Sequence, residues 1–124
     1  MISGDHLLIA LIVVAILVAV DIISGFAAAW ATNTIQSSKI REGLWHKAGY
    51  VFIISAALTV EWGAAHGLEL GFEVPLVIPI CVWISLMEIV SVLENAKKMN
   101  PDLQSVPGFE RLKKDNEEDK EEEQ

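Results

Sequence analysis

The stretch from Leu7 to Ala31 contains one charged side chain, Asp21, and otherwise consists almost entirely of apolar residues. About 20 helical residues, at 1.5 Å each, are enough to cross the ~30 Å hydrocarbon core of a bilayer. Residues 1–6 contain no Lys or Arg, and the run exceeds a usual signal-peptide core, so we expect a transmembrane helix. A signal peptide cleaved after the alanines at 27–29 is the alternative interpretation.

Two further apolar runs follow, residues 48–65 with Glu61 and residues 75–93 with Glu88. Both are near the minimum spanning length. The sequence therefore predicts an all-α membrane protein with three spans, at about 7–31, 48–65 and 75–93. Pro75 suits the first turn of the third helix, whereas Pro79 is expected to lie deeper and to kink it.

The charges beside the spans predict the orientation of the chain in the membrane. Residues 32–47 contain Lys39, Arg41 and Lys47, whereas residues 66–74 contain only acidic charges. By the positive-inside rule the first connection faces the cytoplasm, which puts the N-terminus outside and the C-terminus inside. We expect the three basic residues to contact anionic headgroups, with a solvated loop that only fixes topology as the alternative.

The sequence divides into a transmembrane domain, residues 1–97, and a cytoplasmic tail, residues 98–124. Much of the net charge of −8 comes from residues 115–124, where seven acids stand against one Lys. This acidic end has nothing apolar to bury, so we expect it to be disordered and to act by solvation or charge repulsion. The charge balance disfavours nucleic-acid binding.

The residue types give no indication of enzymatic chemistry or of a bound cofactor. The lone Cys81 excludes an intrachain disulfide, and one Cys with three scattered His residues has no metal-ligand spacing. Phosphate-binding loops, nucleophile elbows and metalloprotease motifs are absent from the sequence. We therefore expect no catalytic residue, no metal site and no cofactor.

Polar and small residues fall on single helical faces of the spans. In the first span Asp21, Ser24, Gly25, Ala28 and Ala29 share one face, where small residues allow close helix packing. In the third span the polar face contains Cys81, Ser85, Glu88, Ser91 and Asn95.

Each span thus brings one carboxyl group into the membrane. An ionised acid near the centre of a bilayer costs roughly 2.5–3.5 kcal/mol, and no basic residue lies inside the three predicted spans to offset that cost. We therefore expect the protein to form a homo-oligomer in which the acids are protonated or reached by water. The alternative is a static bundle whose acids only hydrogen-bond between helices.

The ordered set of residues 21–25 (Asp-Ile-Ile-Ser-Gly), 37–39 (Ser-Ser-Lys) and 88–95 (Glu-Ile-Val-Ser-Val-Leu-Glu-Asn) resembles the toxin secretion/phage lysis holin family. The resemblance covers about residues 15–100. Glu61 stands near the position where an Asp is expected in the family, and the acidic tail end departs from the usual pattern.

The resemblance implies a phage- or prophage-encoded protein that permeabilises the bacterial cytoplasmic membrane as a large homo-oligomer. Its functional partner would be an endolysin or a secreted toxin that passes through the lesion as cargo. We expect Gly25, Ala28 and Ala29 to pack helices together. The residues expected to line or gate the lesion are Asp21, Ser24, Glu61, Ser85, Glu88 and Ser91.

Two other classes of protein fit the same pattern of spans. In a small cation channel or transporter subunit, the membrane acids would bind ions along a narrow path. In a regulatory scaffold, the cytoplasmic tail would anchor another protein and the spans would need no lumen.

Overall fold

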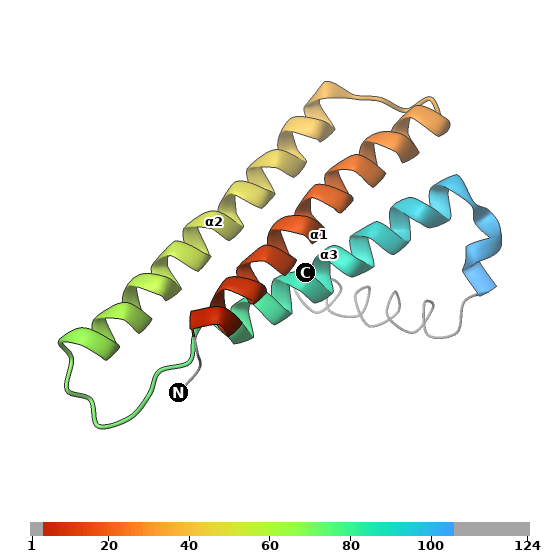
Figure 1. The fold of residues 1–124 in the computed structure, drawn as a ribbon. Helices are drawn as coiled ribbons and strands as arrows, with labels where there is room; N and C mark the ends of the chain where they lie inside the picture. Colours follow the sequence, from red (N-terminus) through yellow and green to blue (C-terminus); the bar gives the residue numbers. More distant parts are fainter. Residues whose placement is uncertain (1–3, 106–124) are drawn as a thin grey trace, which may run out of the picture.

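The computed structural model describes residues 4–105 as three long helices and one short 3-10 helix (Figure 1). The long helices are α1 (Gly4–Ala31), α2 (Ser37–His66) and α3 (Val77–Met99), and the short helix is η1 (Pro101–Ser105). All three long helices are long and apolar enough to cross a membrane, and the described residues contain no strand. The predicted all-helical class with three candidate spans is confirmed.

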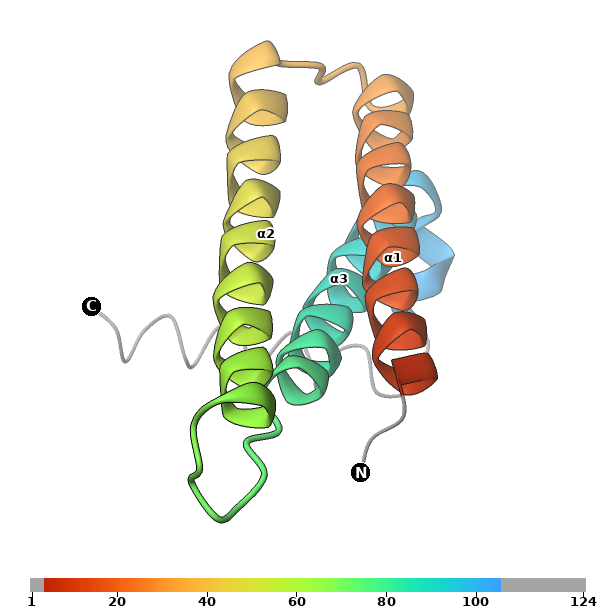
Figure 2. The same cartoon turned by 60° about the vertical axis from the view of Figure 1, so that its left-hand side comes forward.

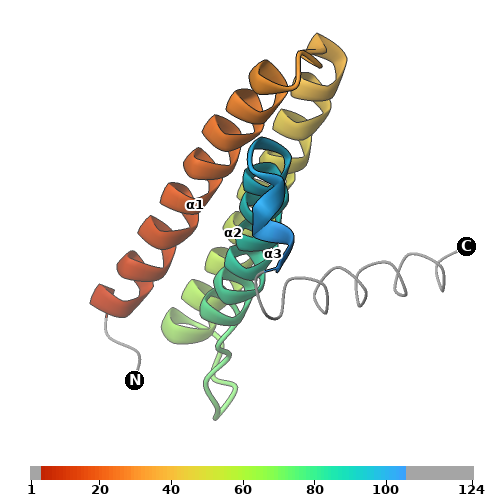
Figure 3. The same cartoon turned by 90° about the vertical axis from the view of Figure 1, so that its right-hand side faces the viewer.

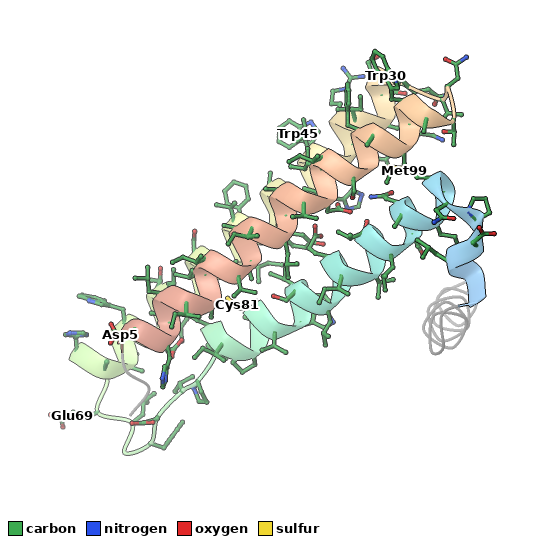
Figure 4. The ribbon with its side chains drawn as sticks, turned by 45° about the vertical axis from the view of Figure 1, so that its right-hand side comes forward. Asp5, Trp30, Trp45, Glu69, Cys81 and Met99 are labelled. Carbon is green, nitrogen blue, oxygen red and sulfur yellow. The ribbon has the colours of Figure 1, made fainter. Side chains whose placement is uncertain are left out.

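The three long helices run alternately up and down. α1 and α3 run in the same chain direction and α2 runs in the opposite one (Figures 1 and 2). Asp5 and Glu69 lie at one end of the bundle, whereas Trp30 and Met99 lie at the other (Figure 4). Beyond Met99 the chain turns, and η1 lies back beside the end of α3 (Figure 3).

The apolar core takes residues from all three helices. α1 packs most extensively against α3, and α2 makes a smaller contact with α3. Val77 and Ile84 of α3 are fully buried, and Val14 of α1 and Ala57 of α2 pack in the same cluster. Cys81 also lies in this core, between the ribbons of α1 and α3 in Figure 4.

The outward faces of the helices are strongly apolar. Ile16 and Ile23 of α1, Phe52 of α2 and Leu86 of α3 are each more than half exposed. Water would solvate such faces poorly, whereas acyl chains suit them, and every backbone group in a helix interior is hydrogen-bonded as a membrane requires. The exposed surface therefore matches a protein that is embedded in lipid.

The helices differ from the predicted spans at their starts. α2 begins at Ser37, so residues 37–47, expected to connect two spans, form its first three turns. A hydropathy run stops at charged side chains, but the backbone of a helix continues through them because Lys, Arg and Glu are good helix formers. Pro79 is the third residue of α3 rather than a deeper one. Its missing N–H there removes no intrahelical hydrogen bond.

Two sequence predictions, the acidic tail end and the orientation in the membrane, concern features that residues 4–105 do not test. The acidic tail end, residues 115–124, lies outside the described residues. The orientation with the N-terminus outside stays a prediction from the charges that flank the spans.

Ile84→Ala is expected to lower the free energy of unfolding in detergent micelles by about 1–2 kcal/mol. Lipid and detergent also solvate an aliphatic side chain, so mainly the cost of the cavity, ~24 cal/mol per Å³, remains. Leu86→Ala, on the exposed face of the same helix, is the matched control and should change the stability little. Equal losses for both variants would contradict the core described above.

Candidate functional site

The three long helices meet around a charged cluster made of Asp21, Lys47 and Glu88. Lys47 Nζ of α2 lies 2.6 Å from Asp21 Oδ2 of α1 and 3.0 Å from Glu88 Oε2 of α3. The side chains are only 15%, 9% and 3% exposed for Lys47, Asp21 and Glu88. We call these three residues the lysine–carboxylate cluster.

The cluster lies about a third of the way along α1 and α2 from the end of the bundle that carries the turn between them, and about halfway along α3. Asp21 is ten residues before the end of α1, Lys47 ten after the start of α2, and Glu88 eleven before the end of α3. At 1.5 Å per residue each side chain is about 15 Å from the same end of the bundle. The antiparallel course of α2 therefore brings the three charges to one level.

Asn95 extends the polar network by two helical turns along α3. Its Nδ2 group lies 3.1 Å from Asp21 Oδ1 and 3.1 Å from Ser24 Oγ, and it donates to both. The hydroxyl of Ser24 in turn donates to the backbone oxygen of Asp21. A Cβ at Gly25 would lie 3.4 Å from Asn95 Nδ2, so the glycine lets the asparagine approach α1 closely.

The cluster compensates part of the charge that the spans bring into the membrane. Two carboxylates share one ammonium group, and both oxygens of Asp21 accept a hydrogen bond. The expectation that the membrane acids have no basic partner is therefore wrong for Asp21 and Glu88. The sequence places Lys47 in the connection because its neighbour Ala48 begins the apolar run, but its ammonium points into the bundle.

Glu61 has a different position and a different role. Its Oε2 accepts the backbone N–H of Val77 at 2.9 Å. Val77 is the first residue of α3, and Leu76 before it has no side chain that can cap a helix. A carboxylate at this place satisfies one free N–H and interacts favourably with the helix dipole. Glu61 lies fourteen residues from Lys47, or about 21 Å along α2.

The remaining predicted residues differ in their position and burial. Ser24 joins the network and Ala28 is buried, whereas Ser85 is half-buried one turn before Glu88. Ser91 and Ala29 line a groove between the helices. Lys39 and Arg41 are exposed on the first turns of α2.

Two residues of the network, Lys47 and Asn95, were not among the predicted lesion-lining residues. Asn95 follows Glu88 by seven residues, so the polar face of the third span already indicated it. No periodic pattern in the second span indicates Lys47, because its partners, Asp21 and Glu88, lie on other helices. Within residues 4–105 no group of three His, Cys, Asp or Glu residues is placed to hold a metal ion.

A family model described as the bacteriophage holin family matches residues 3–109. The chain belongs to the bacteriophage holin family. The match contains all three long helices, the lysine–carboxylate cluster and Glu61. No curated protein and no solved structure matched the chain.

In this holin-family protein, Lys47→Met is expected to lower the free energy of unfolding in micelles by about 3–5 kcal/mol. The change leaves two buried carboxylates without their cation, and breaking a buried pair on one side has a cost of this size. Adding Asp21→Asn and Glu88→Gln to Lys47→Met should recover most of the stability, because the amides remove the unpaired charges.

The matched control is Lys39→Met, which removes the same side chain two turns earlier on the exposed surface of α2. It should change the stability by less than about 0.5 kcal/mol. Equal effects of Lys39→Met and Lys47→Met would show that the cluster does not stabilise the protein.

Glu61→Leu is expected to loosen the first turn of α3. Loss of a cap costs about 1 kcal/mol, and amide hydrogen exchange at Val77 should speed up by about fivefold. Glu61→Gln keeps an oxygen that can accept the same hydrogen bond, so its exchange rate should stay closer to that of the unchanged protein. Slow exchange at Val77 in Glu61→Leu would contradict the capping role.

Proposed function

We propose that this protein is a phage or prophage holin that homo-oligomerises in the bacterial cytoplasmic membrane and opens large lesions there. The lesions would let an endolysin reach the peptidoglycan, or let a toxin leave the cell. The observation that carries the proposal is the family match over residues 3–109, in a chain whose three apolar helices share a buried charged cluster. The proposed mechanism starts from that cluster.

The closed protomer protects its charges from lipid. An ionised side chain at the centre of a bilayer costs about 2.5–3.5 kcal/mol on insertion scales, and the pairing of Lys47 with two acids reduces that cost. One carboxylate remains in excess over the single ammonium. Water that reaches the cluster in an assembly of many copies would solvate all three groups, so the charges favour a wetted assembly over dry, separate protomers.

The residues on the polar interior of the bundle would become the wall of the lesion. Asp21, Ser24 and Glu88 belong to the network, and Ser91 lines the neighbouring groove. Helix separation would expose these side chains while the Leu, Ile and Val faces stay against lipid. Ser85 and Glu61 complete the proposed lining set, with Glu61 acting near the start of α3.

The small and basic residues would take part in the same rearrangement. Gly25 and Ala28 pack within the protomer, and their small side chains suit a second helix equally well after α3 moves away. Lys39 and Arg41 are exposed where anionic headgroups would meet them. Lys47 would reach that surface after the cluster opens.

A small cation channel is the second candidate function. Asp21 and Glu88 both lie within 3.0 Å of the same ammonium group, so their carboxylates form a pair that already holds one cation. In a channel subunit this pair would bind permeating ions along a fixed narrow path. The size of the molecules that cross the membrane separates the two functions.

The test is induced expression in a bacterium, with release of a cytoplasmic enzyme and uptake of a small dye measured together. The unchanged protein should release the enzyme. Asp21→Leu and Glu88→Leu should each slow enzyme release by about tenfold, equivalent to ~1.4 kcal/mol. Each variant removes a charged group whose solvation by water favours the open lesion. Ile23→Leu, on the exposed face of α1, is the control and should release the enzyme at the normal rate.

Membrane fractions from all strains should contain equal amounts of protein, so that differences reflect activity. Enzyme release that is unaffected by both Leu variants would contradict the lining assignment. Passage of ions or dye without enzyme would favour the cation channel.

A further inference from the structure

A groove of about 340 Å³ lies between the second half of α1 and the first half of α2, with α3 as its third wall. It opens toward the end of the bundle that carries the turn from α1 to α2. Its sides include Ile22 and Phe26 of α1 and Leu44 of α2, and Asp21 and Lys47 lie at its inner end. We call it the α1–α2 groove.

The apolar sides of the groove are open to the surroundings of the protein. Ile22, Phe26 and Leu44 are 41%, 50% and 50% exposed. All three belong to candidate membrane spans, so the space beside them is filled in a bilayer either by lipid or by another protein segment.

The shape of the groove suits an extended chain. It follows α1 from Asp21 to Thr32, a length of about 16 Å, or three helical turns. A flexible acyl chain fits this length.

The charge of the groove favours an anionic headgroup. Lys39 of α2 and Lys98 of α3 line it, and both are exposed. Asp21 is the only acidic residue among the described lining residues, and its carboxylate already holds Lys47 and Asn95. The charges of Lys39 and Lys98 therefore remain available to an anion.

The turn between α1 and α2 adds one neutral donor at the same end. Gln36 lines the groove with a side-chain amide, whereas the Thr32 hydroxyl donates to Ala28 O and the Thr34 hydroxyl donates to Thr32 Oγ1. A phosphodiester is a strong acceptor for ammonium and amide N–H groups. The groove thus has donors at its mouth and apolar walls further in, which match the phosphate and the acyl chain of a phospholipid.

We propose that the α1–α2 groove binds one anionic phospholipid. Its phosphate lies between Lys39 and Lys98, and one acyl chain runs between Phe26 and Leu44 toward the lysine–carboxylate cluster. The site requires only that the protein is embedded in a membrane, and it does not depend on lesion formation. By the predicted orientation the lipid comes from the cytoplasmic leaflet.

The test is native mass spectrometry of the full chain, purified in a non-ionic detergent and titrated with phosphatidylglycerol or phosphatidylcholine of equal chain length. One phosphatidylglycerol should bind more tightly than phosphatidylcholine. Lys39→Gln and Lys98→Gln should each weaken phosphatidylglycerol binding by about fivefold. Lys97→Gln removes the charge next to Lys98 on α3, outside the groove lining, and should leave the affinity unchanged.

A second pair of variants tests the place of the acyl chain. A Cβ at Gly43 or at Gly49 meets no atom within 4 Å, so both positions accept a larger side chain. Gly43 lines the groove and Gly49 is not among its lining residues. Gly43→Leu should abolish lipid binding, whereas Gly49→Leu should retain it.

Several outcomes would overturn the proposal. Equal binding of the two lipids, unaffected by Lys39→Gln, would indicate ordinary boundary lipid. Binding of glycerol phosphate as tight as that of the whole lipid would indicate a site for anions alone. A dimer that Gly43→Leu disrupts, with no lipid bound, would assign the groove to a second copy. Because none of these measurements uses leakage, failure here is distinct from failure of the holin function.

Discussion

The structure depends on one cation that serves two acids from different helices. Lys47 is the group through which α2 contacts both Asp21 of α1 and Glu88 of α3, about 15 Å from the end of the bundle that carries the α1–α2 turn. Apolar packing holds helices together weakly in lipid, because lipid solvates the same side chains well. A charged cluster in that setting has few alternative partners, so it fixes the level at which the three helices meet.

The helix α2 is attached to its neighbours by polar contacts at two levels. Lys47 provides one contact, about a third of the way along α2, and Glu61 provides the other by capping the start of α3. Between them lies the small apolar core around Ala57 and Ile84. The α1–α2 groove lies between the same helix and α1, beside the first turn. A bundle with one helix held partly through charges can separate when water replaces those contacts, which is what the proposed lesion requires.

Much of the fold could be predicted from the sequence, because long apolar runs in lipid leave few alternatives to helices. The sequence predicts the three spans, the polar faces around Asp21 and Glu88, and the family. It does not predict the residues at which the helices begin. Hydropathy measures where side chains prefer to be, and it places the start of the second span at Ala48 although the backbone is helical from Ser37.

The sequence by itself determined that this chain forms three membrane helices and that each brings a carboxyl group with it. Only the tertiary structure decided which charges meet. Lys47 looked like part of a basic connection, but an antiparallel α2 carries its ammonium to Asp21 and Glu88, 26 and 41 residues away along the chain. Glu61 looked like a third acid of the same kind, yet it caps α3. The physical reason is that periodicity fixes the face on which a side chain lies, whereas its partner depends on the relative depth of neighbouring helices.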